Sequence, residues 1–160
     1  EKSRGLGDVY KRQGEDAWGQ PTPEAAAQLT GAPPTDLESA IASHIEGQRI
    51  WGSPGHVDEA RWHADAERAF HRSFDPAGVG RQYFAAVASR GWADELPNVA
   101  TPTLVMHGTA DTLLDISGGR RTAELIPGAR FVALEGMGHD YPRAFWQQWV
   151  DEVATFCLAN

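Results

Sequence analysis

Two short polar segments of the sequence contain residue types used in acid–base catalysis. His107-Gly108-Thr109-Ala110-Asp111 follows one apolar run, and Gly136-Met137-Gly138-His139-Asp140 follows another. Asp111 and His139 are separated by about the length that one loop, one helix and one strand consume. A carboxylate bonded to one imidazole nitrogen fixes the tautomer of the ring, whose other nitrogen can then take a proton from a hydroxyl nucleophile. The pair therefore has the residue types needed for nucleophilic catalysis.

Each member of the pair also has a simpler interpretation. Asp111 could cap a turn, as aspartate often does in loops, and His139 could be a hydrogen-bonded loop residue. Asp115 and Asp140 are alternative carboxylate partners for His139. Asp140 adjoins the histidine, however, and Asp115 lies deeper in its loop. The shared context of Asp111 and His139 therefore favours these two as the functional pair.

Residues 14–98 have the pattern of helices separated by Pro and Gly, and they show no useful period-two alternation. Thr22-Pro23 has an N-cap residue before a proline at the first helical position. Thr35 and Glu38 have the spacing of a capping box, and Asp75-Pro76 predicts the start of a fourth helix. We expect most aromatic residues of this half, such as Trp62 and Phe84, to pack in its core.

The pattern changes after Pro97. The runs 103–106 and 131–134 are short and continuously apolar, which is typical of parallel strands buried on both faces. Ser117 can cap a helix that runs to about Ile126, and Pro142 can open a final helix. Strand, helix, strand and helix in this order place the residues that follow both strands at the same edge of the sheet.

These segments resemble the α/β-hydrolase superfamily. Thr101–Gly108 followed by Asp111 is similar to the acid-bearing strand and loop of that superfamily, and Gly136–His139 is similar to its histidine loop. The order Asp before His also matches. Gly52-Ser53-Pro54-Gly55 and Phe74–Gly78 resemble the cap of hydrolases similar to anthracycline (aclacinomycin) methylesterases.

The resemblance implies an α/β fold: the carboxyl-terminal part of a three-layer α/β-hydrolase. Residues 14–98 would form a helical cap, and residues 99–160 the last two parallel strands with their helices. His139 would be the general base and then the acid for the leaving group, and Asp111 would orient it. The implied reaction is hydrolysis of a carboxylic ester of a small, fairly apolar molecule through an acyl-serine intermediate, without a metal or organic cofactor.

The nucleophile is not found in the sequence. None of the seven serines lies in the G-x-S-x-G elbow of these enzymes. Ser53 comes nearest, but Trp51 occupies the first glycine position, and Pro54 lacks the N–H that an oxyanion hole would use. Cys157 is expected in the core. We expect the elbow to lie upstream of this chain. The chain would then be a truncated domain that is inactive by itself.

Other chemistries remain open for the same Asp/His pair. They are those of dehalogenases, epoxide hydrolases, cofactor-free haloperoxidases and C–C bond hydrolases, and a non-catalytic binding homologue is a further alternative. A helical stripe of acidic and histidine residues could hold a metal, although such a stripe is more often a solvated face. The stripe consists of His56, Glu59, His63, Glu67 and His71.

Composition narrows the partners and the compartment. The net charge is −8 and the isoelectric point about 5.1, which argues against a nucleic-acid-binding surface or an anionic-membrane surface. One cysteine cannot form an internal disulfide, and a cytoplasmic enzyme is expected. Both lysines lie in residues 1–13, so we interpret this segment as a non-native leader. The sequence leaves the oligomeric state open.

Overall fold

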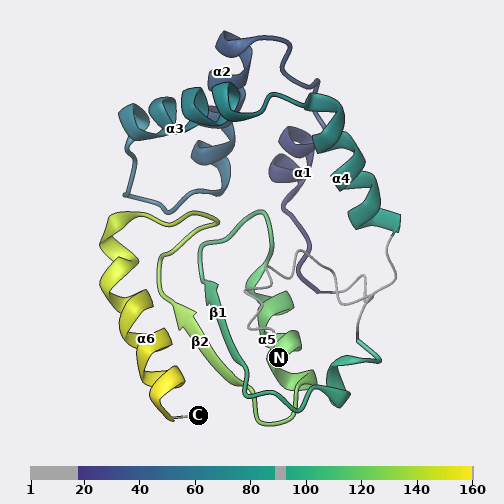
Figure 1. Cartoon of the computed structure of the whole chain (residues 1–160), viewed down its shortest axis with the longest axis vertical. Coiled ribbons are helices and arrows are strands. Elements are labelled where there is room, and N and C mark those ends of the chain that lie inside the picture. Colours follow the sequence, from purple (N-terminus) through teal and green to yellow (C-terminus); the bar gives the residue numbers. More distant parts are fainter. Residues whose placement is uncertain (1–17, 89–92, 160) are drawn as a thin grey trace.

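The computed structural model describes residues 18–88 and 93–159, so the expected leader, residues 1–13, lies outside the described residues. Helices α1 to α4 gather at one end of the molecule, and the strands lie at the other end with α5 and α6 (Figure 1). The helices of the first group are α1 (Pro23–Leu29), α2 (Leu37–Trp51), α3 (Glu59–Arg72) and α4 (Pro76–Ala88). The second group contains β1 (Leu104–Gly108), α5 (Ile116–Leu125), β2 (Arg130–Leu134) and α6 (Trp146–Ala159), with short 3-10 helices at Leu96–Asn98 and Arg143–Phe145.

The starts of the first two helices follow local capping chemistry. The Thr22 side chain accepts a hydrogen bond from the backbone N–H of Ala25, which confirms the predicted N-cap. The expected capping box of Thr35 and Glu38 is wrong by one residue. Asp36 is the N-cap of α2, and Asp36 and Ser39 bond reciprocally to each other's backbone N–H groups. The short Asp36 carboxylate competes successfully for the free N–H groups of the first turn.

Helices α2 and α3 pack against each other, with Trp62 and Ala66 buried on the inner side of α3. Trp62 is 7% exposed, as expected for a core aromatic residue. Phe84 of α4 is 70% exposed, so the expectation of core packing is wrong for this side chain. Helix α4 has no extensive contact with another helix or strand among the described residues, which explains the difference.

The two strands pair in parallel, from Leu104 opposite Arg130 to Gly108 opposite Leu134. The first strand extends two residues beyond the predicted run, so that His107 belongs to the strand rather than to the loop. Burial on both faces was also expected, but within the described strands β1 and β2 only Gly108 and Leu134 are buried. In the described part of the chain the sheet has two strands, too few to cover both faces.

Helices α5 and α6 lie next to these strands. Helix α5 packs on β1 and β2, and its N-cap is Asp115 rather than the expected Ser117. Pro142 is extended and is followed by a 3-10 turn before α6 begins. Arg130 of β2 forms an ion pair with Glu152 of α6. Cys157 is exposed on α6, so its expected core position is wrong, and the apolar side chains of Val150 and Leu158 are exposed on the same helix.

None of the helices described between residues 18 and 159 combines the length and the apolar character needed to cross a bilayer.

Candidate active site

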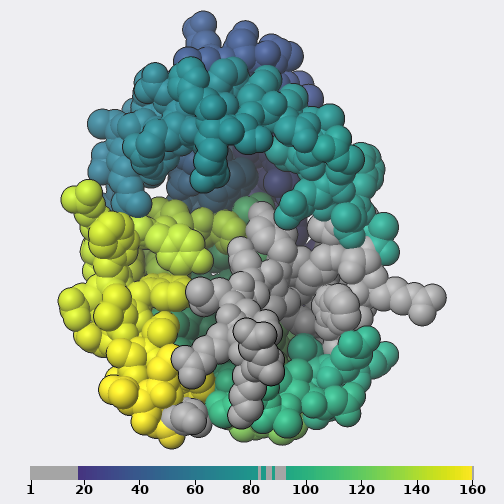
Figure 2. Space-filling view, in the orientation of Figure 1, coloured from purple at the N-terminus to yellow at the C-terminus, as the bar shows by residue number. Residues whose placement is uncertain are grey.

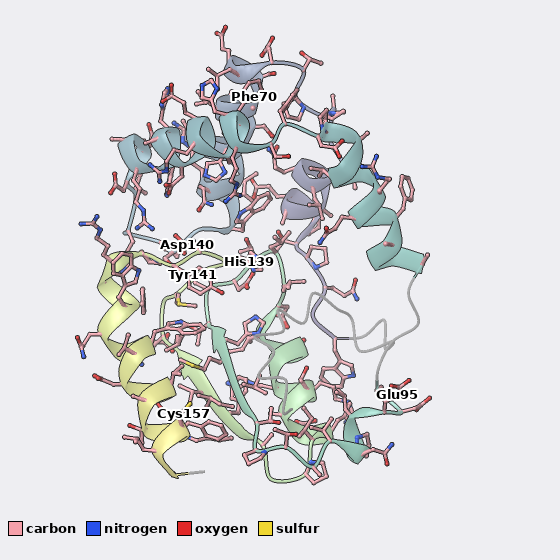
Figure 3. All side chains as sticks on the ribbon, viewed as in Figure 1. Phe70, Glu95, His139, Asp140, Tyr141 and Cys157 are labelled. Carbon is pink, nitrogen blue, oxygen red and sulfur yellow. The ribbon has the colours of Figure 1, made fainter. Side chains whose placement is uncertain are left out.

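The loops that follow the two strands bring Asp111 and His139 together. Strand β1 ends at Gly108 and β2 ends at Leu134, and the ends of these parallel strands lie at the same edge of the sheet. His139 Nδ1 lies 2.8 Å from Asp111 Oδ2, although the residues are 28 positions apart in the sequence. Figure 3 shows His139 between the strands and the first group of helices.

Asp111 is held on both of its carboxylate oxygens. Its side chain is 6% exposed. Oδ1 accepts hydrogen bonds from the backbone N–H groups of Leu113 and Leu114, at 2.9 and 2.8 Å. Oδ2 faces both His139 and His107. The carboxylate is therefore fixed by its own loop and by two imidazoles.

The surroundings of Asp111 stabilise its ionised form. Burial by itself raises the pKa of the Asp111 carboxyl, because it disfavours charge. Hydrogen bonds from His107 and His139 outweigh burial, with further contributions from the charge of His139 and from the backbone. The pKa of Asp111 therefore lies well below its ordinary value of 3.8, and the residue is a carboxylate at neutral pH.

His107 is a site residue that sequence reasoning quoted only as part of the loop motif. Its Nε2 atom lies 2.7 Å from the carbonyl oxygen of Leu114, to which it donates, and 3.5 Å from Asp111 Oδ2. Burial lowers the pKa of His107, but the hydrogen bonds to Asp111 and Leu114 and the nearby carboxylates raise it, for a net increase above 6.5. A Cβ atom at Gly119 would lie 2.5 Å from His107 Nδ1, so the glycine of α5 makes room for this ring. The signal available in the sequence was the spacing of four residues between His107 and Asp111.

His139 can perform acid–base chemistry in this geometry. Its side chain is 26% exposed, which leaves it partly accessible beside the buried Asp111. The bond to Asp111 places the proton of the neutral ring on Nδ1, so that Nε2 carries the basic lone pair. A hydroxyl group brought to Nε2 could transfer its proton there.

The two alternative carboxylate partners have other roles in the structure. Asp115 caps α5, where its Oδ1 accepts a hydrogen bond from the Ser117 N–H at 3.0 Å. Asp140 Oδ1 accepts hydrogen bonds from the backbone N–H and the hydroxyl of Ser53, which is 3% exposed. Ser53 therefore belongs to a buried hydrogen-bond network, and Asp111 is the carboxylate paired with the ring of His139.

A cavity of about 450 Å³ opens beside His139, between α2 and α3 on one side and the segment after β2 on the other. In Figure 2 the face between the blue-to-teal helices and the yellow-green carboxyl-terminal part is hollowed. The volume is suitable for a small-molecule ligand. The lining combines apolar surface from Val57, Trp62, Tyr141 and Pro142 with polar side chains that include His44, Gln48, Arg61 and Asp65.

Three residues of the stripe considered for metal binding make other contacts. Glu59 forms an ion pair with Arg49 of α2, and His71 contacts the ring of Phe70. His56 precedes α3 and packs edge-on against Phe145, with ring centroids 5.3 Å apart. Residues 18–88 and 93–159 contain no group of three or more His, Cys, Asp or Glu side chains that could hold a metal ion.

The sequence is similar to those of known methylesterases. The chain is 32% identical over 110 residues to a rhodomycin D methylesterase from Streptomyces peucetius, a match covering 67% of this chain and 36% of the methylesterase. No protein-family model matches the chain.

Solved structures resemble the chain as well. An esterase from Rhodococcus superposes with a TM-score of 0.58 at 26% identity, over 87% of this chain and 48% of the esterase. An enol-lactonase from Burkholderia xenovorans gives a TM-score of 0.63 at 24% identity, over 85% of this chain and 49% of the lactonase. The chain thus spans about a third of the length of the methylesterase and about half of each solved structure. The chain is a relative of the α/β-hydrolases and has the fold of their carboxyl-terminal part, in which a helical cap precedes two parallel strands and their helices.

Proposed function

We propose that the chain is the carboxyl-terminal portion of a serine hydrolase that cleaves carboxylic esters of small molecules. The observation that carries the proposal is the 2.8 Å contact between Asp111 and His139 at the ends of adjacent parallel strands. The similarity to a methylesterase and to an esterase supports ester hydrolysis. In this proposal residues 14–98 form the cap over the site and residues 99–160 supply the pair.

His139 acts twice in the proposed reaction. Its Nε2 takes the proton of a serine hydroxyl while the serine oxygen attacks the ester carbonyl carbon. The proton then passes to the alkoxide that leaves, and an acyl-serine ester remains. Water is activated by the same nitrogen and releases the carboxylic acid. Asp111 keeps the ring oriented and stabilises the imidazolium that forms in each half-reaction, and no metal or organic cofactor takes part.

The proposal assigns the nucleophile and the oxyanion donors to residues outside this chain. The absence of G-x-S-x-G from the sequence supports this assignment, as does the partial coverage of the relatives. We therefore expect the chain alone to hydrolyse p-nitrophenyl acetate at the background rate. Turnover that disappears in the His139→Gln variant would contradict this expectation.

The substrate is proposed to be a fairly apolar ester. Val57, Trp62 and Pro142 give one part of the cavity an apolar surface. The rhodomycin D methylesterase is named for the hydrolysis of a methyl ester, and its similarity to the chain supports an ester substrate. We also propose a cytoplasmic location for the enzyme, which the single cysteine of this chain supports.

The decisive experiment is to express the complete reading frame that contains this chain. We expect a G-x-S-x-G segment upstream and ester hydrolysis that is lost in the Ser→Ala, His139→Gln and Asp111→Asn variants. Aspartate at the nucleophile position would instead favour a dehalogenase or an epoxide hydrolase. A small inert residue there, without turnover, would overturn the enzyme proposal in favour of a binding homologue.

A further inference from the structure

The end of helix α2 is hydrogen-bonded to the loop that carries His139. Three consecutive residues, Trp51, Gly52 and Ser53, face three consecutive residues, Gly138, His139 and Asp140. We call these six residues the cap clamp. The cap clamp joins segments about 85 positions apart in the sequence, one from the helical group and one from the strand group.

Backbone and side-chain hydrogen bonds close the cap clamp. The His139 N–H donates to the Trp51 carbonyl oxygen at 2.6 Å, and the Gly138 N–H donates to Ser53 Oγ at 2.8 Å. Ser53 in turn donates to Asp140 Oδ1 from its hydroxyl at 2.5 Å and from its N–H at 2.9 Å. The catalytic candidate and both of its neighbours in the chain are therefore bonded to the end of α2.

The two backbones also approach too closely for a side chain to fit between them. A Cβ atom at Gly138 would lie 2.4 Å from the carbonyl carbon of Gly52 and 2.5 Å from the carbonyl oxygen of Trp51. Gly138 and Ser53 are both buried. Because buried hydrogen bonds lose little to competing water, this contact holds the loop firmly.

We propose that Ser53 is a positioning residue for His139, acting through Gly138 and Asp140 to hold the imidazole against Asp111. The proposal rests on the proposed role of His139 as the general base. Ser53 supplies the acceptor for the Gly138 N–H. Its hydroxyl also binds the carboxylate of Asp140, a residue 87 positions further along the sequence. Asp140 is thereby prevented from replacing Asp111 as the partner of the ring.

The test measures the tautomer of His139 from the ring ¹⁵N chemical shifts of the whole chain. In the wild type we expect the proton on Nδ1, where Asp111 accepts it. In Ser53→Ala the Gly138 N–H is left buried without an acceptor, and the ratio of the Nδ1–H to the Nε2–H tautomer should fall about fivefold or more. The readout needs no substrate, so it distinguishes failure of this proposal from failure of the proposed reaction.

His107 provides an internal control in the same spectra. His107 lies on β1, and its Nε2–H donates to the Leu114 carbonyl oxygen, a bond that involves no residue of the cap clamp. A general loosening of the fold would alter the tautomers of both histidines, whereas loss of positioning should alter His139 alone. Ser73→Ala is the matched substitution at an exposed serine and should change neither ring.

A second pair of variants covers the case in which Ser53→Ala does not fold. Asp140→Asn keeps an oxygen that can accept from Ser53 and should retain the wild-type tautomer of His139. Asp140→Ala removes the acceptor and should lower the tautomer ratio as Ser53→Ala does. An unchanged His139 tautomer in Ser53→Ala, or in Asp140→Ala when only that variant folds, would overturn the proposal, as would an equal change at His107.

Discussion

His107 Nε2 lies 3.5 Å from Asp111 Oδ2, the oxygen that is also 2.8 Å from the ring of His139. The carboxylate thus faces one imidazole from β1, the strand that precedes its loop, and one from the loop after β2. His107 lies on β1 and donates to the Leu114 carbonyl oxygen, so it connects the strand to the loop that holds Asp111. We interpret His107 as a support for Asp111 rather than as a group that contacts substrate.

Replacing His107 should give a loss of stability that depends on pH. The pKa of His107 is raised above 6.5 in the folded state, so the protonated ring stabilises the fold. This contribution is fully present below the ordinary value and is lost as the pH rises through the raised value. The difference in unfolding free energy between wild type and His107→Gln should therefore be larger at pH 6 than at pH 9, as measured by urea denaturation.

The exposed His63 of α3 offers a matched control for the substitution. His63→Gln shows how much of the pH effect comes from losing any histidine. A difference for His107→Gln that grows with rising pH would contradict the assignment of His107 as a stabilising cation beside Asp111.

Asp111→Asn should destabilise the fold at neutral pH by on the order of 1–3 kcal/mol, because a buried carboxylate that accepts several hydrogen bonds is replaced by a neutral amide. The lowered pKa of Asp111 means that its contribution is present above the ordinary value of 3.8 and is lost as the pH falls through the lowered value. The difference between wild type and variant should therefore shrink on acidification below about pH 4. A difference that persists unchanged in acid would contradict the role of the ionised carboxylate.

The site pair could be predicted because it follows a local pattern. Asp111 and His139 each come a few residues after a short apolar run, and parallel strands bring such positions together. The role of Ser53 could not be predicted in this way. Its partner Asp140 is 87 positions away, and a hydrogen bond between two irregular loops leaves no periodicity in the sequence.

Errors in the predicted elements have local physical causes. Asp36 displaced Thr35 as the N-cap of α2, and Asp115 displaced Ser117 as the cap of α5. In both places several side chains with capping ability lie within two or three residues, so the composition fixes the helix but not its first residue. The strands were expected to be buried on both faces, but burial depends on neighbouring strands rather than on the strand's own residues.

Two glycines of the histidine loop should respond differently to alanine. Gly138 has backbone atoms of Gly52 and Trp51 within about 2.5 Å of a Cβ position, so Gly138→Ala should destabilise the fold by about 3 kcal/mol or more. Gly136 has a φ of +76° with open space around it, so Gly136→Ala should cost only the left-handed strain of about 1–2 kcal/mol. Thermal and urea unfolding of both variants would measure the difference.

Gly80 is the control for this comparison. It lies inside α4 with nothing near its Cβ position, and Gly80→Ala should be neutral or should stabilise by about 0.5–1 kcal/mol. Equal destabilisation by Gly136→Ala and Gly138→Ala would show that the two backbones of the cap clamp separate easily.

The last turn of α2 should depend on Thr112, the residue after Asp111. Thr112 Oγ1 donates to the Ile50 carbonyl oxygen at 2.8 Å, and the next carbonyl, that of Trp51, accepts the His139 N–H. The last carbonyls of a helix have no partner within it, so the two loops of the site satisfy the end of α2. Thr112→Val keeps the shape of the side chain and removes the donor, and it should destabilise the fold by about 1 kcal/mol.

The matched control is Thr103→Val. This substitution removes the hydrogen bond that the Thr103 hydroxyl donates to the Thr101 carbonyl oxygen. Thr112→Val should also speed amide exchange at His139, because weaker docking of α2 loosens the acceptor of that N–H, whereas Thr103→Val should leave this exchange unchanged. Hydrogen exchange followed by NMR would measure both variants. Unchanged exchange at His139 in Thr112→Val would mean that the two loops contact α2 independently of each other. Faster exchange in Thr103→Val would mean that exchange at His139 responds to any loss of stability, which would also contradict the prediction.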